Sequence, residues 1–164
     1  MNVPQLTYQS FITDLMYTLS THKQLNTVLN GDNIIDFQNP KVPNFSGIVY
    51  PYCYVLNNYV TVQSTNNNNL MSVTCDFILA DRFQDTSQTI NMIQSNMIEI
   101  AKDIIYLNMN VTGCSKPYRI MDGFKIQINT WADKGQDVLA GCSFTVTFII
   151  EQPLSREWPL MSNV

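Results

Sequence analysis

The side chains best suited to chemistry are four widely spaced cysteines and a single histidine: Cys53, Cys75, Cys114, Cys142 and His22. Thiolates and an imidazole together could bind zinc, but structural zinc sites place their ligands in closely spaced pairs such as CxxC. No such pair occurs in this sequence. We therefore predict free thiols, buried or partly buried on strands, a histidine at the surface, and no metal site.

A catalytic set cannot be assembled from the remaining polar residues. The motifs GxSxG and HExxH are missing, and so are the phosphate-binding loops GxxxxGK[ST] and GxGxxG. Two carboxylate pairs, Asp81 with Asp85 and Asp133 with Asp137, could share a cation or a proton. Helix capping and turn formation explain both pairs more simply. We predict no catalytic residue and no cofactor, and hence a protein that is not an enzyme.

Charged residues are scarce, at 13% of the chain, and Asn, Gln, Ser and Thr take their place. A surface of this kind suits contact with other protein. The net charge of −4 argues against tight binding of nucleic acid, because phosphates are held by clustered Lys and Arg. No apolar run reaches the roughly 18 residues of a membrane span, and the first residues lack the pattern of a secretory signal. We expect a soluble protein.

The elements that position these residues are clearest between Leu70 and Met109. Apolar and polar residues alternate from Met71 to Leu79, which predicts a strand with one buried face. From about Gln88 to Met109 apolar residues recur every three or four positions, which predicts an amphipathic helix of roughly 33 Å. We place its N-cap near Thr86 or Ser87. A helix of this length implies a broad sheet beneath it.

The chain before this stretch also carries helix and strand patterns. An N-terminal helix is expected to begin at Pro4 or Thr7 and to end between Ser20 and Lys23. Leu25, Val28 and Leu29 could add one more helical turn, and Asn33 to Phe37 looks extended. A strand is expected from Gly47 to Leu56, where Pro51 requires either a bend or an edge position. A further short strand could run from Tyr59 to Gln63.

After the long helix, a loop from Asn110 to Pro117 leads to a last hairpin. Its strands are expected at Phe124 to Thr130 and at Phe144 to Ile150, each with one buried face.

Two segments stand out as candidate interaction arms. The run Asn66 to Asn69 is either a simple hairpin tip or a protruding loop that docks on a partner. The residues that follow Pro153 are either an extended arm on a neighbouring subunit, anchored by Trp158, or a tail folded back on its own domain. The candidate interface residues are Tyr59, Asn66, Asn67, Asn68, Asn69, Leu154, Trp158, Leu160 and Met161.

Three strings resemble a known family: CDFILADR from Cys75 to Arg82, IQSNM from Ile93 to Met97, and VLAGCSFTV from Val138 to Val146. The last string is followed by Glu151-Gln152-Pro153. They are similar to neck or tail-completion proteins of crAss-like and other Bacteroidetes-infecting tailed phages. The resemblance implies a tail terminator-like α+β domain over residues 1–153, with a mixed or largely antiparallel sheet. An N-terminal helix and one long helix would pack on one face of it. Residues 154–164 would be a C-terminal arm, which departs from the family pattern, as does the Asn-rich hairpin.

The same resemblance implies a structural virion protein. Copies would form a homo-oligomeric ring in the phage neck and join the portal and head to the tail. Its partners would be itself, the portal and adjoining neck or tail proteins, with no membrane, and DNA would pass through the ring without tight binding. The alternative is a small non-catalytic binding module or assembly chaperone that uses an exposed sheet edge near Gly47 to Tyr54.

Overall fold

Two helices and six strands form in the part of the chain that the computed structural model describes, which comprises residues 7–30, 48–64, 69–83, 88–108, 118–121, 123, 125–133 and 138–152. In chain order they are α1 (Tyr8–Ser20), β1 (Thr27–Asn30), β2 (Tyr52–Ser64), β3 (Asn69–Arg82), α2 (Ile90–Asn108), β4 (Tyr118–Ile120), β5 (Asn129–Asp133) and β6 (Leu139–Gln152). The predicted α+β class with a single domain is confirmed.

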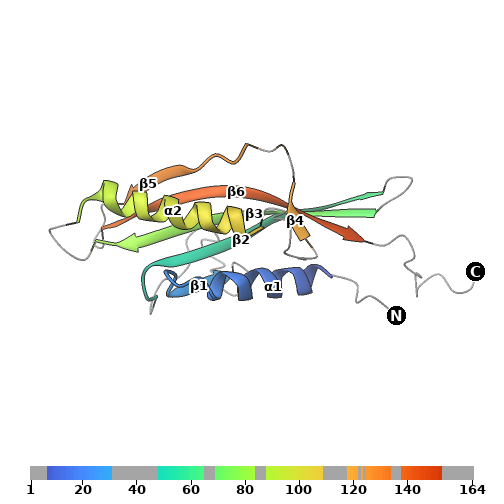
Figure 1. Cartoon of the computed structure of the whole chain (residues 1–164), viewed down its shortest axis with the longest axis horizontal. Helices are drawn as coiled ribbons and strands as arrows, with labels where there is room; N and C mark the ends of the chain where they lie inside the picture. Colours follow the sequence, from blue (N-terminus) through green and yellow to red (C-terminus); the bar gives the residue numbers. More distant parts are fainter. Residues whose placement is uncertain are drawn as a thin grey trace, which may run out of the picture.

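The strands form one open, mixed sheet in the order β1-β2-β3-β6-β4, and β5 also pairs with β6. All pairs are antiparallel except β1 with β2, which is parallel. β5 lies opposite the first part of β6 and β4 opposite its later part. The long strands β2, β3 and β6 run side by side, and at the end where β6 finishes they extend past both helices (Figure 1).

Helix α1 begins where the sequence predicted. The Thr7 hydroxyl accepts from the backbone N–H of Ser10, and the Ser10 hydroxyl accepts from the backbone N–H of Thr7, which completes a capping box. Phe11, Leu15 and Leu19, spaced four residues apart, form the buried face.

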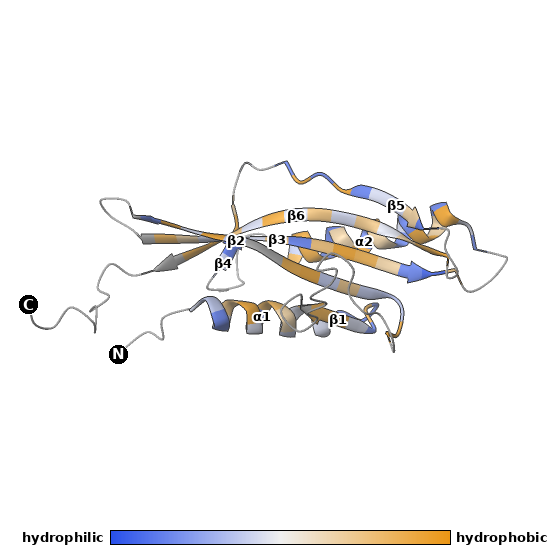
Figure 2. Ribbon diagram, turned by 180° about the vertical axis from the view of Figure 1, so that it is seen from behind, coloured by the Kyte–Doolittle hydropathy of each residue, from blue (hydrophilic) through white to orange (hydrophobic). Residues whose placement is uncertain are grey.

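Helix α2 buries the predicted apolar stripe on the same face of the sheet. Ile93, Met97, Ile100 and Ile104 join the α1 residues in one hydrophobic core with the alternate residues of β3 from Met71 to Leu79. Hydrophobic residues recur along β3 and β6 beneath the helices (Figure 2). The expectation that both helices pack on one face is therefore confirmed. The predicted N-cap at Thr86 or Ser87 lies outside the described residues.

Aromatic contacts join α1 to the sheet. The Phe77 and Phe144 rings lie opposite each other on β3 and β6 and stack with centroids 4.9 Å apart. Phe11 of α1 makes an edge contact with Tyr118 at 4.9 Å and a tilted contact with Phe148 at 5.3 Å. A smaller cluster around Tyr52, Tyr54 and Ala80 occupies the opposite face of the sheet.

The possible extra helical turn at Leu25 to Leu29 is wrong, because Thr27–Asn30 is strand β1. It pairs in parallel with Tyr52–Val55, so Val28 lies beside Cys53 and Leu29 beside Tyr54. Pairing with a distant strand outweighs the weak local preference for a helix.

The strand expected at Gly47 to Leu56 begins later, because the chain bends at Tyr50 and Pro51 and β2 begins at Tyr52. β2 then continues to Ser64 and includes the separately expected strand from Tyr59 to Gln63. A shift in its register with β3 between Asn57 and Tyr59 separates the two halves.

The last hairpin exists, with different limits. Its first strand was expected at Phe124 to Thr130, but β5 spans Asn129–Asp133, and its residues are mostly exposed rather than buried on one face. Residues 125–128 lie outside any strand. The short strand β4 was not predicted, because three residues show no readable period.

Candidate functional site

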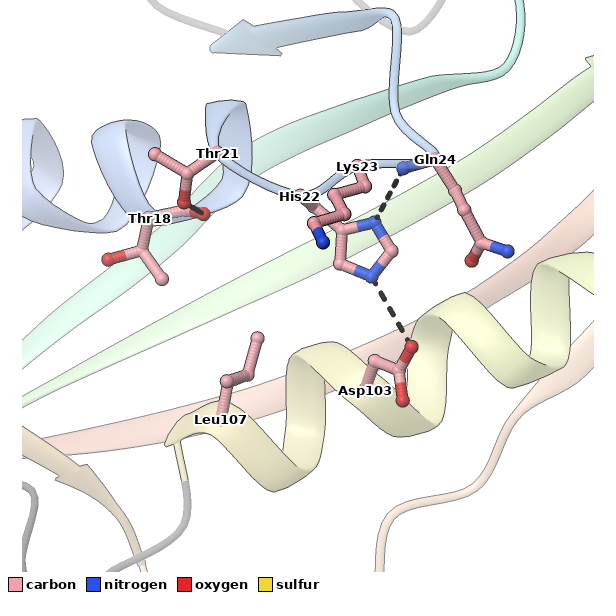
Figure 3. Close-up of a pocket in the computed structure, with 7 residues that line it drawn as sticks. All are labelled: Thr18, Thr21, His22, Lys23, Gln24, Asp103 and Leu107. Carbon is pink, nitrogen blue, oxygen red and sulfur yellow. Dashed lines mark hydrogen bonds and ion pairs between the residues drawn. The ribbon is translucent and has the colours of Figure 1, made fainter.

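His22 lies at the surface but is partly buried there. Its side chain is only 10% exposed, in a cavity of about 640 Å³ between the end of α1 and α2 (Figure 3). Its Nδ1 accepts the backbone N–H of Gln24 at 3.3 Å. Nε2 lies 3.4 Å from the Oδ2 of Asp103, to which it donates in the neutral tautomer. A contact between α1 and α2 could not be read from the periodicity of either helix.

The His22 and Asp103 pair resembles part of a catalytic set, and Thr18, Thr21 and Lys23 line the same cavity. The Thr21 hydroxyl lies in the same wall and donates to the carbonyl of Thr18 at 2.7 Å. The pair instead joins the connection after α1 to the exposed face of α2. We interpret the His22 and Asp103 pair as a structural contact between the end of α1 and α2.

The cysteine prediction is confirmed for the three cysteines that the structure describes. Cys53, Cys75 and Cys142 are free thiols, fully buried on β2, β3 and β6. Burial raises the pKa of Cys75 and of Cys142 to about 12, and burial beside Cys142 also raises the pKa of Cys53. Such thiols are protonated and inert at neutral pH. Among the described residues, no three side chains are arranged to bind a metal ion.

The strongest surface feature is the end of β2, residues 59–64, which pairs with residues 69–74 of β3 and which we call the hairpin arm. Tyr59 is 60% exposed, Val60 44% and Val62 71%. Their partners across the ladder, Val73 opposite Val60 and Met71 opposite Val62, are buried. The apolar row of the core therefore continues across β3 onto a strand that neither helix covers.

Among the described strands, none pairs with the outer edge of β2 along the hairpin arm. Strand β1 pairs with Tyr52–Val55, and no other described strand pairs with that side of β2. The edge near Gly47 to Tyr54, on which the binding-module alternative depended, is occupied by β1 over Tyr52, Cys53 and Tyr54. The open edge therefore lies at residues 59–64.

The predicted interface residues fall partly on the hairpin arm. Tyr59 is exposed on β2, and Asn69 begins β3 opposite both Ser64 and Gln152. The others lie outside the described residues: Asn66, Asn67, Asn68, Leu154, Trp158, Leu160 and Met161. Sequence reasoning missed Val60 and Val62, although their alternation with Tyr59, Thr61 and Gln63 was a visible strand signal.

A polar cleft of about 400 Å³ lies beside the hairpin arm. Tyr59, Thr74, Thr147 and Asn129 line part of it, and the hydroxyls of Thr74 and Thr147 are 3.0 Å apart. Hydroxyl and amide groups make up most of this lining, and Lys125 adds a cation to it.

No family model and no curated protein matches the chain. Within the described ranges, no helix is both long enough and apolar enough to cross a bilayer.

Proposed function

We propose that this protein is a structural virion component that assembles into a homo-oligomeric ring in the neck of a tailed phage. The ring joins the portal and head to the tail and surrounds the DNA channel. The observation that carries the proposal is the hairpin arm, an uncharged strand with an open edge and exposed apolar residues beyond the core. The family resemblance of the three sequence strings supports the phage assignment.

The hairpin arm supports assembly because an exposed apolar edge is hazardous for a free monomer. Natural proteins protect sheet edges with charged residues, prolines or a covering element. From Tyr52 to Ser64, β2 contains no charged residue and no proline. The neighbours of a closed ring would cover the arm of every subunit.

The charge of the chain is compatible with a channel for DNA. Its net charge of −4 disfavours strong binding to phosphates. A channel that DNA must pass through requires weak rather than strong contacts with its walls. Helices packed on a rigid sheet would serve as the spacer between subunits.

Mass photometry and negative-stain electron microscopy of the purified chain test this proposal, first alone and then with portal and adjoining neck proteins. We expect ring-shaped particles in at least one of these mixtures, and we expect the chain in the proteome of purified virions. A monomer that ignores every virion component and is missing from virions would overturn the proposal.

A further inference from the structure

The strand that precedes the C-terminal residues ends at the tip of the hairpin arm. Gln152 of β6 lies opposite Asn69, which in turn lies opposite Ser64 of β2. Figure 1 shows β6 ending at the same end of the molecule as the β2-β3 hairpin. Residues 153–164, twelve in number, follow in the sequence. Fully extended, they span roughly 40 Å, which exceeds the roughly 20 Å length of the open edge at residues 59–64.

We propose that residues 153–164 of one copy add a strand to the open β2 edge in the hairpin arm of a neighbouring copy. This inference rests on the proposed ring and names the contact that joins its subunits. The segment that gives the strand and the edge that receives it are different surfaces. Each copy therefore gives one strand and receives one, and such a head-to-tail contact forms a ring when the rotation between successive copies closes.

The spacing of the prolines in the C-terminal segment fits such an added strand. Backbone N–H groups of alternate residues in a strand point toward the same neighbour. Pro153 and Pro159 are both odd-numbered, so both lack an N–H on the same side of the strand. That side would face away from β2. Every even-numbered residue of the segment keeps its N–H for the ladder.

The apolar side chains also match in spacing. Trp158 and Leu160 are two residues apart, so they would share one face of an added strand. Val60 and Val62 have the same spacing on the hairpin arm and are 44% and 71% exposed. Aromatic and aliphatic side chains beside β-branched ones form favourable cross-strand pairs.

A neighbouring copy fits this edge better than the same chain does. Val62 and Tyr59 are 71% and 60% exposed. Among the described residues, no strand of the same chain covers this edge.

Cysteine cross-linking between two differently labelled full-length chains tests the contact. Both chains carry Cys114→Ser, and the other cysteines are Cys53, Cys75 and Cys142, which are buried. One chain also carries Val62→Cys and the other Leu160→Cys. As the matched control, Tyr17→Cys replaces Val62→Cys, because Tyr17 is 68% exposed on α1. Mild oxidation and a non-reducing gel report cross-linked dimers, and mass photometry of the same samples reports assembly.

We expect the band to shift from monomer to dimer in the mixture of Val62→Cys and Leu160→Cys chains, and to remain monomeric in the control. Assembly without that dimer would overturn the strand contact and leave the ring proposal intact. A monomer in every mixture with virion components would overturn the ring itself. A single chain carrying both Val62→Cys and Leu160→Cys tests whether the C-terminal segment binds the β2 edge of its own chain instead. A cross-link within that chain at high dilution would show the tail on its own edge and overturn the inference.

Discussion

The body of the sheet and the hairpin arm are built from the same strands with the same alternation, but they meet different surroundings. Val73 and Met71 on β3 are buried in the core, at 0% and 6% exposure. Their neighbours on β2, Val60 and Val62, belong to the same apolar row and stay at the surface. Apolar alternation thus marks a face that something covers, without specifying whether the cover is a helix of the same chain or another subunit. We infer that the body provides stability and the arm provides association.

Alkaline pH should destabilise the body through its buried thiols. Burial raises their folded-state pKa values, to about 12 for Cys75 and Cys142, so the unfolded chain loses its thiol protons first as pH rises. From pH 8 to 10 the free energy of unfolding should fall by about 2 kcal/mol for each buried thiol. Urea denaturation across this range in a Cys114→Ser background measures the fall. Adding Cys75→Ala should make it shallower, and an unchanged pH dependence would contradict the burial argument.

Truncating an aromatic side chain in the core should destabilise the fold far more than truncating one on the hairpin arm. Phe148 is fully buried and contacts the rings of Phe11, Phe77 and Tyr118. Phe148→Ala should lower the free energy of unfolding by about 3–5 kcal/mol. The matched change on the arm, Tyr59→Ala, should alter subunit stability by less than about 0.5 kcal/mol. Urea denaturation below the assembly concentration measures both. Similar losses from the two substitutions would erase the distinction between body and arm.

A methyl group at Gly141 should also destabilise the body. A Cβ atom at this position would meet the backbone carbonyl oxygen of Leu79, which cannot move without disturbing the β3-β6 ladder. Gly141→Ala should lower the free energy of unfolding by about 1–3 kcal/mol. Thermal denaturation compared with Ser143→Ala, on the same strand and face, is the measurement. If both variants melt alike, the close approach of β6 to Leu79 is not rigid.

A charge on the arm should weaken assembly while leaving the fold intact. Val62→Lys places an ammonium group where the neighbouring subunit should bind, and edge lysines prevent strand addition. We expect self-association to weaken about tenfold or more, which corresponds to at least about 1.4 kcal/mol. Sedimentation velocity measures association, and circular dichroism confirms folding. Tyr17→Lys is the control of similar exposure, and equal weakening by both lysines would remove the special role of the arm.

Sequence reasoning predicted the elements that local patterns define. Thr7 and the spacing of Phe11, Leu15 and Leu19 define α1 without any distant contact. β1 was missed because its pairing with Tyr52–Val55 joins segments with different local preferences. The open edge at residues 59–64 was misplaced for the same reason, since it depends on where β1 ends. The cover over His22 comes from α2, which is distant in sequence, so no local signal could reveal it.

The position of β6 has a consequence for how the protein is made on the ribosome. β6 pairs with β3, β4 and β5, which all precede it in the chain. Its pairing with β3 joins residues 57 to 83 positions apart, since Arg82 pairs with Leu139 and Asn69 with Gln152. Contacts this distant slow folding. The nascent chain therefore carries the β2-β3 hairpin, with its uncharged strand β2, without β6 beside it until residue 152 emerges.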